Sequence, residues 1–525
     1  MKISKRTIIL TMIILLLLSL TGCGRENKEK KTVFQEDEVY TIADSTGDWG
    51  FPAPYTHYNR GPGYVRMSLI FDTLIWKDKT GSFVGALAQK WEYVEDDTAF
   101  VFQLRKDVKW HDGESFTAAD VLFTLDYLKE HPYSWSDISL IDRAEALDSH
   151  TVKVYLKKAY APLLANVAGT LPILPRHIYK NINSPLEYTE SDALVGTGPF
   201  KLVDYNKEHG TYLYAANEDY YLGQPRINKL QFIKIGEQMI PNAVLDGTAN
   251  TGSIPPELVE QFKAKGLTVL VSDHSWNAKL KFNLQEEPFA NKKFRQALAY
   301  GIDRKKLVNI SQRGHAVIGS PGFIPPDNPW YSSEIEQYDY NPEKARKLLE
   351  ELGYVLEREF LEKGSKPFTV EILTSGRFSG DAELVKNDLD KLGIKTTVRS
   401  MDGKTVDART TEWSFQLVIS GHGGLGGDPA FFNTNVLADT FHSARYKDNQ
   451  ELLSLLNQQL ETIDENKRRE LLAEIQKIYA IDIPALSLYY PTTYEAMDSK
   501  VDLYYTPGGL ASGIPIALNK LSFLQ

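Results

Sequence analysis

The hydrophobic pattern is most consistent in residues 69–128, where it predicts a strand, a turn and a capped helix. Large apolar side chains recur at every second position across 100–104, the period of a strand with one buried face. Gly113 follows in a turn that its positive φ would suit. Thr117 and Asp120, three residues apart, are typical of a helix capping box. The helix behind them carries an apolar stripe made of Val121, Leu122, Leu125 and Leu128.

Strands and helices alternate in the second half of the chain. A strand at 368–373, a helix at 381–392 and a strand at 394–398 predict a parallel pair joined by a right-handed crossover. Residues 415–420 form a further buried strand. In open α/β sheets, ligands lie beyond the carboxyl ends of the strands. We therefore expect a binding site directly after residue 420.

The length and composition indicate a folded protein of more than one lobe. A chain of 525 residues exceeds what one hydrophobic core holds. A hydrophobic fraction of 42% with 24% charged residues is typical of folded soluble domains. The formal charge of −10 argues against nucleic acid as a partner, because phosphate binding needs a basic surface. Further strands are predicted at 39–43, 151–156, 201–205, 211–215 and 230–235, and helices at 289–302, 341–353 and 451–479.

The N-terminus predicts export and lipid attachment. Three basic residues precede an apolar run at 8–20, which is typical of an export signal and too short for a confident membrane span. Leu20-Thr21-Gly22-Cys23 follows and looks like a lipobox, whose cysteine thiol receives a diacylglyceryl group before cleavage. Cys23 is the only cysteine in the chain. We expect a lipoprotein signal peptide at 1–22 and a polar tether at 23–38; an ordinary signal peptide with an incidental Cys23 is the alternative.

Several motifs together resemble one bacterial family. Gly85-Ala86-Leu87-Ala88, the strand end at 102–105 and the run from Trp110 to Val121 are similar to the signature of bacterial extracellular solute-binding protein family 5. Gly196-Thr197-Gly198-Pro199-Phe200 matches the GTGPF turn of the same family and lacks the glycine spacing of a phosphate loop. The family contains oligopeptide, dipeptide and nickel-complex receptors of ABC importers.

The resemblance implies an α/β protein with the two-lobe periplasmic-binding-protein-like fold, type II, cluster C. We expect the first lobe at 39–272, with an extra subdomain at about 63–199. The second lobe is expected at 273–490, and residues 491–525 return to the first lobe. Repeated crossings between two lobes make a hinge, and closure around a ligand is a known switching mode of such proteins.

The glycine-rich stretch after residue 420 departs from the pattern of the family's peptide receptors. In those receptors a tryptophan follows the first glycine, and an aspartate three residues later pairs with the ammonium group of the peptide. This chain carries His422 and Leu425 at those two places. The resemblance therefore implies that the usual ammonium anchor is missing. Gly423 and Gly424 would leave backbone amides open to a ligand, and His422 can donate, accept or ligate a metal, or be a solvated bystander.

Three further residues are candidates for the ligand site, each with a structural alternative. Asp428 could replace the missing anchor, or it could cap the helix that follows. Trp49 and Tyr55 lie in an aromatic loop that the resemblance places near the cleft, and packing would explain Trp49 equally well. His111 and Asp112 are expected to shape a turn and not to catalyse a reaction.

The predicted function is a substrate-binding lipoprotein that catches a peptide or similar small solute at the extracytoplasmic face of the membrane. Its partners would be an ABC permease with its ATPase, and the membrane through the lipid on Cys23; we expect a monomer without cofactor or resident metal. A nickel-chelate or other non-peptide cargo is the alternative within the family. A secreted hydrolase lacks any nucleophile or metalloprotease motif in this sequence, and a surface sensor or adhesin would reuse the fold.

Overall fold

The computed structural model describes residues 39–94, 98–357, 360–362 and 367–524. The predicted signal peptide at 1–22, Cys23 and the tether at 23–38 lie outside the described residues. Among the residues described, no helix combines the length and the hydropathy needed to cross a bilayer.

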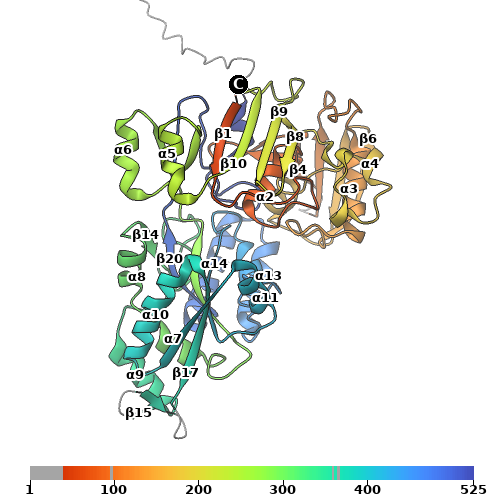
Figure 1. The fold of residues 1–525 in the computed structure, drawn as a ribbon. Coiled ribbons are helices and arrows are strands. Elements are labelled where there is room, and N and C mark those ends of the chain that lie inside the picture. The colour runs from red at the N-terminus through yellow and green to blue at the C-terminus, as the bar shows by residue number, and fades with distance from the viewer. Residues whose placement is uncertain (1–38, 95–97, 358–359, 363–366, 525) are drawn as a thin grey trace, which may run out of the picture. The chain divides into compact units, whose positions relative to one another are not determined.

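The first lobe is built on a seven-stranded mixed sheet (Figure 1). Its spatial order is β12-β21-β11-β1-β10-β9-β8, in which β1 runs parallel to β10 and β11 and the remaining pairs are antiparallel. The strands predicted in this part of the sequence are confirmed. Their bounds are β1 (Val39–Asp44), β8 (Phe200–Asn206), β9 (Thr211–Ala216), β10 (Lys229–Lys234), β11 (Thr251–Ile254), β12 (Thr268–Val271) and β21 (Tyr494–Met497).

Short helices accompany this sheet and the four-stranded sheet described next. The α-helices are α2 (Gly61–Ser68), α4 (Arg176–Tyr179), α5 (Ile240–Leu245) and α6 (Val259–Ala264). A π-helix, η1 (Leu163–Ala168), and the 3₁₀ turns η2 (Pro185–Glu187), η3 (Ser191–Leu194), η4 (Glu237–Met239) and η5 (Pro256–Leu258) complete the set.

A four-stranded antiparallel sheet with one long helix forms a subdomain with its own core. The order is β4-β5-β7-β6, with bounds β4 (Ala88–Val94), β5 (Ala99–Leu104), β6 (Ile141–Asp148) and β7 (Thr151–Leu156). The two-stranded pair β2 (Ile75–Lys77) and β3 (Phe83–Gly85) lies beside it in sequence. The helix α3 (Ala118–Glu130) starts at the predicted capping box, since Thr117 accepts from Ala119 N and Asp120 from Thr117 N.

The second lobe is built on a six-stranded sheet in the order β14-β20-β13-β19-β17-β18. The predicted parallel pairing across the intervening helix is confirmed, because β17 runs parallel to β18, and it also runs parallel to β19. The strand bounds are β13 (Asn277–Phe282), β14 (Ala316–Ile318), β17 (Thr369–Ser375), β18 (Lys395–Met401), β19 (Leu417–His422) and β20 (Ala485–Pro491), with a separate hairpin of β15 (Val355–Glu357) and β16 (Phe360–Glu362).

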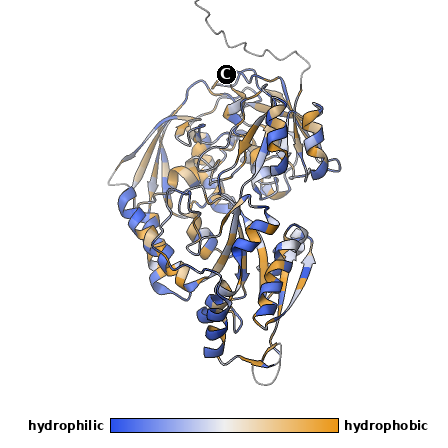
Figure 2. Cartoon of the chain, turned by 90° about the vertical axis from the view of Figure 1, so that its left-hand side faces the viewer, coloured by the Kyte–Doolittle hydropathy of each residue, from blue (hydrophilic) through white to orange (hydrophobic). Residues whose placement is uncertain are grey.

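The helices of this lobe carry both hydrophilic and hydrophobic residues (Figure 2), as expected of helices that bury one face. The helix predicted at 289–302 begins three residues later, because the side chain of Asn291 accepts from Lys293 N and caps it there. The bounds are α7 (Lys292–Gly301), α8 (Arg304–Ser311), α9 (Pro342–Glu351), α10 (Ser379–Lys391), α11 (Gly403–Thr411), α12 (Phe431–Val436), α13 (Gln450–Glu461) and α14 (Glu465–Asp482), with a 3₁₀ turn η6 (Gly376–Phe378).

The chain passes between the two sheets twice within the described residues. It leaves the seven-stranded sheet after β12 and returns to it after β20, because β21 pairs with both β11 and β12. The residue bounds predicted for the lobes and the extra subdomain stay predictions.

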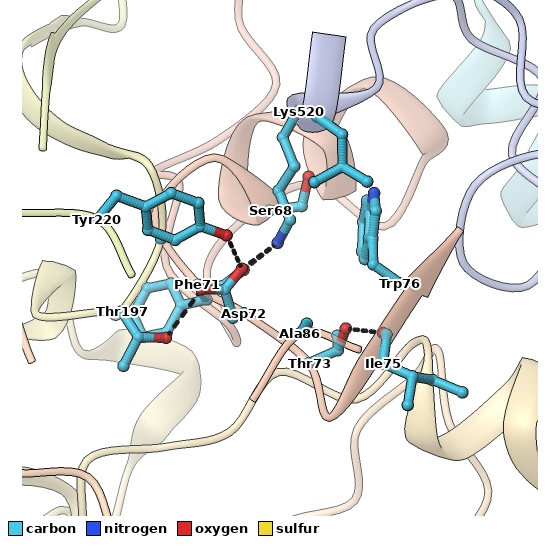
Figure 3. Close-up of polar contacts among 12 residues, drawn as sticks. Ser68, Phe71, Asp72, Thr73, Ile75, Trp76, Ala86, Thr197, Tyr220 and Lys520 are labelled. Atoms are coloured by element: carbon cyan, nitrogen blue, oxygen red, sulfur yellow. Dashed lines mark hydrogen bonds and ion pairs between the residues drawn. The ribbon is translucent and has the colours of Figure 1, made fainter. Parts of the chain in front are cut away.

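A buried ion pair holds the C-terminal segment on the first lobe (Figure 3). Lys520, in the 3₁₀ turn η7 (Lys520–Phe523), donates to Asp72 at 2.5 Å, and both side chains are at most 1% exposed. The same carboxylate accepts from Tyr220 at 3.2 Å and from Thr197 of the GTGPF turn at 3.3 Å. Tyr221 adds a fourth bond at 2.9 Å. The charge of Lys520 is thus matched inside a complete hydrogen-bond network.

Candidate functional site

The central strands of the second lobe have one apolar face and one polar face. On β13, Ala278, Leu280 and Phe282 belong to the main hydrophobic core of the lobe. The residues between them, Lys279 and Lys281, therefore point to the opposite side of the sheet. Despite their charge they are only 1% and 2% exposed. The opposite side of β13 is thus a buried, basic surface.

His422 lies on that same side. The strands β13 and β19 are antiparallel, and His422 is the partner of Asn277 in their register. Partners directly opposite each other project to one face of a sheet, so His422 shares a face with Lys279 and Lys281. The sequence placed His422 directly after a buried strand, and it is the last residue of β19.

The two lysines have hydrogen-bond partners but no ion pair. Lys279 donates to the side-chain oxygen of Asn435 on α12 at 3.0 Å, and Lys281 to the carbonyl of Phe441 at 2.5 Å. Among the described residues, neither ammonium meets a carboxylate at ion-pair distance. Desolvation lowers the pKa of Lys279 to about 7, and it lowers the pKa of Lys281 well below its usual range.

A second histidine stacks on the first. The rings of His422 and His442 lie 3.9 Å apart between centroids, with an angle of 19° between their planes. Nδ1 of His422 bonds the carbonyl of Gly423 at 2.6 Å, whereas Nδ1 of His442 is buried without a partner. Desolvation lowers the pKa of His422 to about 3, and Lys279 adds to this effect. Desolvation and the neighbouring His422 lower the pKa of His442 in the same direction. Both rings are therefore neutral at physiological pH.

Arg60 brings the first lobe into this site. It precedes α2, and its guanidinium bonds Asp407 of α11 at 2.5 Å. It also lies over the ring of Phe441, 4.6 Å from the centroid. The charge of Arg60 contributes to the lowered pKa of both His422 and His442. We call Arg60, Lys279, Lys281, His422 and His442 the basic cluster. It lies where residues of the two lobes meet.

The glycines after β19 allow backbone segments to approach one another. Gly424 has a φ of +95°, and a Cβ placed on Gly427 would lie 2.8 Å from the carbonyl of Ser512. A Cβ on Gly513 would lie 2.7 Å from the carbonyl of Gly424. The sequence predicted amides of Gly423 and Gly424 that face a ligand. The structure places this loop against the C-terminal loop at 508–515, so close packing of two backbones accounts for the glycines.

Two of the predicted site residues have structural partners. Leu425 is 1% exposed and packs in a core with Phe432 and Val436, so its side chain does not line an open surface. Asp428 forms a two-point ion pair with Arg468, with distances of 2.7 and 2.5 Å, and accepts from Ala430 N at the start of α12. Its charge is therefore neutralised within the protein.

The two aromatic candidates, Trp49 and Tyr55, contact residues that do not belong to the basic cluster. Trp49 donates its indole N–H to Asp44 at 2.7 Å and is half-buried beside Tyr58. Tyr55 donates to the carbonyl of His131 at 2.7 Å and packs edge-on against two other tyrosines of the subdomain. Packing is the role that these contacts support for Tyr55.

The sequence analysis missed four members of the site. Arg60 and His442 lie in loops without a motif, and Lys279 and Lys281 alternate with apolar residues in the manner of a half-exposed strand. In the described residues, no group of three or more His, Cys, Asp or Glu side chains could hold a metal ion. The arrangement is suited to holding a polar solute between two lobes, because it offers cationic groups from both lobes and aromatic rings from the second.

The chain is similar to a family of known proteins. The family profile described as "Bacterial extracellular solute-binding proteins, family 5 Middle" matches residues 82–443. The dipeptide-binding protein of Escherichia coli (strain K12) is 26% identical over 484 residues, which cover 85% of this chain and 88% of that protein. Heme-binding protein A of Haemophilus influenzae is 27% identical over an alignment of 542 residues, which covers 93% and 94%.

Solved structures share the fold. NikZ from Campylobacter jejuni, in complex with Ni(L-His), superposes with a TM-score of 0.79 at 23% identity and covers 91% of this chain and 98% of its own. This likeness confirms the predicted two-lobe α/β fold of the type II periplasmic binding proteins.

Proposed function

The chain belongs to family 5 of the bacterial extracellular solute-binding proteins and is the solute-binding component of an ABC importer, and we propose that its cargo is a short peptide. The dipeptide-binding relative supports this choice of cargo. The protein would hold the peptide between its lobes as a monomer and release it unmodified to the permease.

The observation that carries this proposal is the meeting of both lobes at the basic cluster. Arg60 of the first lobe contacts Asp407 and Phe441 of the second. A solute held there touches both lobes only when they are closed, so its binding shifts the population toward the closed form. Closure is then the signal that a permease can recognise.

A chelated metal ion is the second candidate for the cargo, on the basis of one observation. The stacked rings of His422 and His442 are neutral, and a neutral imidazole is a common metal ligand. Because the described residues include no cluster of three or more ligating side chains, the metal would have to arrive with ligands of its own. The structural neighbour with Ni(L-His) supports keeping this alternative.

Mass spectrometry of the small molecules that copurify with the protein tests the cargo. We expect short peptides, and we expect a pool of di- and tripeptides to raise the melting temperature of the emptied protein. The peptides should be recovered intact after incubation, as a receptor requires. Stabilisation by nickel with histidine, and none by the peptide pool, would favour the chelate instead.

We further propose that a lipid on Cys23 holds the protein at the extracytoplasmic face of the membrane. The sequence supports this through the lipobox-like Leu20-Thr21-Gly22-Cys23 and the polar tether behind it. Cys23→Ser is expected to move the protein from the membrane fraction to the soluble fraction or to leave the signal uncleaved. Membrane retention of a cleaved Cys23→Ser protein would contradict lipid attachment.

A further inference from the structure

Among the described residues, the basic cluster contains more basic groups than acids that pair with them. Arg60 lies over the ring of Phe441, Lys281 donates to the carbonyl of the same residue, and the neighbouring His442 stacks on His422. Asp407 pairs with Arg60, whereas Lys279 and Lys281 donate to neutral oxygens. Two buried lysine amino groups therefore have no counterion among the residues described.

An ammonium group that is buried without a counterion is unfavourable, because one neutral hydrogen bond does not offset its loss of hydration. The pKa of both lysines is lowered in the empty protein for this reason. An anion that enters the site favours the protonated lysines and attracts them through a medium of low dielectric constant, where the attraction is stronger than in water. Binding of a negatively charged group would thus be coupled to protonation of the lysines.

We propose that the basic cluster binds a carboxylate of the solute, so that the protein selects its cargo by a negatively charged group. This inference rests on the proposed function and names the feature of the peptide that is recognised. For a peptide, the group is the C-terminal carboxylate.

Arg60 is the group through which the carboxylate would enter. Its guanidinium has parallel N–H donors that match the two oxygens of a carboxylate. The contact with Asp407 uses one of its nitrogens, Nη2, and the Arg60 side chain remains 31% exposed. The solute carboxylate would therefore bind beside Asp407 or replace it. Lys279 and Lys281, protonated when the anion is bound, would stabilise it through their charge from the buried face of β13.

The two positions considered for an ammonium anchor, Leu425 and Asp428, support the same conclusion. Asp428 is neutralised by Arg468, and Leu425 has no charge and is buried. The loop after β19 thus offers no free carboxylate for the amino end of a peptide. Recognition of the cargo through its carboxylate is the alternative that these residues leave.

Paired peptide pools test the inference. One pool contains di- and tripeptides with free carboxyl ends and no acidic side chains, and the other contains the same peptides amidated at the C-terminus. We expect the free-acid pool to stabilise the protein in thermal unfolding. Amidation should raise the half-saturating concentration at least tenfold, because it removes the negative charge.

Variants then assign the effect to the cluster. Arg60→Gln and Lys281→Met should each reduce the preference for the free-acid pool over the amidated pool at least tenfold. Lys395→Met, which changes an exposed lysine in β18 of the same sheet, should keep the full preference. Arg60→Gln alters a partly exposed side chain, so it remains informative if Lys281→Met does not fold.

The possible failures can be told apart. If the two pools stabilise the wild-type protein equally, the carboxylate inference is overturned and the peptide proposal stands. If neither pool stabilises it, both are overturned. A preference for free acids that persists in Arg60→Gln and in Lys281→Met would place the carboxylate elsewhere and contradict the assignment to this cluster.

Discussion

Two sites in this molecule bury lysine side chains in opposite ways. In the first lobe, Lys520 donates to Asp72, whose carboxylate also accepts from tyrosine and threonine hydroxyls (Figure 3). In the second lobe, Lys279 and Lys281 are equally buried, yet each donates to a neutral oxygen. The first arrangement is electrostatically complete, whereas the second is not.

The difference separates a structural role from a binding role. A paired and fully hydrogen-bonded charge holds two segments of a chain together, here the C-terminal turn and the segment directly before β2. A buried amino group without a counterion contributes nothing comparable to the fold, and in the proposal above it serves an interaction with a solute that enters the site. Perturbed titratable groups gather at functional sites for this reason.

The largest expected effect follows from breaking the complete site. Asp72→Asn leaves the ammonium of Lys520 buried without a counterion, and removing one partner of a buried pair costs about 3–5 kcal/mol. We expect the free energy of unfolding, measured in urea, to fall by about that amount. Ligand binding at the basic cluster should persist while the protein remains folded.

Two further variants make this prediction specific. Asp502→Asn, an exposed acid in the same C-terminal segment, should change the free energy of unfolding by less than about 0.5 kcal/mol. Adding Lys520→Met to Asp72→Asn should recover most of the loss, because it removes the unpaired charge. A loss below about 1 kcal/mol in Asp72→Asn would show that the two lysine sites do not differ as argued.

Replacing a lysine of the basic cluster should raise the free energy of unfolding, opposite to the change expected for Asp72→Asn. Lys279→Met removes a buried charge and one neutral hydrogen bond, so we expect the free energy of unfolding at pH 7 to rise by about 1 kcal/mol or more. The same change should weaken binding of peptides with a free carboxylate. A loss of stability as large as that in Asp72→Asn would contradict the comparison.

The stability gain from Lys279→Met should depend on pH. Burial lowers the pKa of Lys279 to about 7 in the folded protein, whereas a lysine in an unfolded chain titrates near 10.4. Between these values the unfolded chain binds the proton that the folded chain has released, so stability rises with pH, by up to about 1.4 kcal/mol per pH unit. The penalty is fully present below pH 7 and disappears toward pH 10.4. The difference in free energy of unfolding between the parent and Lys279→Met should therefore be smaller at pH 9 than at pH 7. Lys395→Met should follow the parent at both pH values.

Much of the fold could be predicted from the sequence because its signals are local. The capping box at Thr117 and Asp120 lies within one turn of helix, and the crossover from 368 to 398 needs only hydrophobic periods and glycine stops. These elements appear where the pattern placed them. Boundaries moved by a few residues where a side chain caps a helix, as Asn291 does.

The candidate site could be predicted only in part, because its members meet through tertiary contacts. His422 was found since it directly follows a strand of recognisable pattern. Lys279 and Lys281 alternate with apolar residues, and in a sequence that alternation indicates lysines facing solvent. Only the packing of α12 and the loop at 437–449 over this face shows that they are buried. Asp428 was a binding candidate in the sequence, and only the structure shows that its charge is paired. Its partner Arg468 lies 40 residues away in the chain.

The smallest expected change in stability concerns the contact between the lobes. Arg60 and Asp407 are 31% and 24% exposed, and ion pairs of this kind contribute at most about 1 kcal/mol. Asp407→Asn should therefore leave the free energy of unfolding within about 1 kcal/mol of the parent. Because it removes the acid that pairs with Arg60, the half-saturating concentration of free-acid peptides should fall, while that of amidated peptides stays unchanged. Weaker binding of the free-acid pool to Asp407→Asn would show that Asp407 positions Arg60 for the solute, and the uncompensated charge of the cluster would then not be what attracts it.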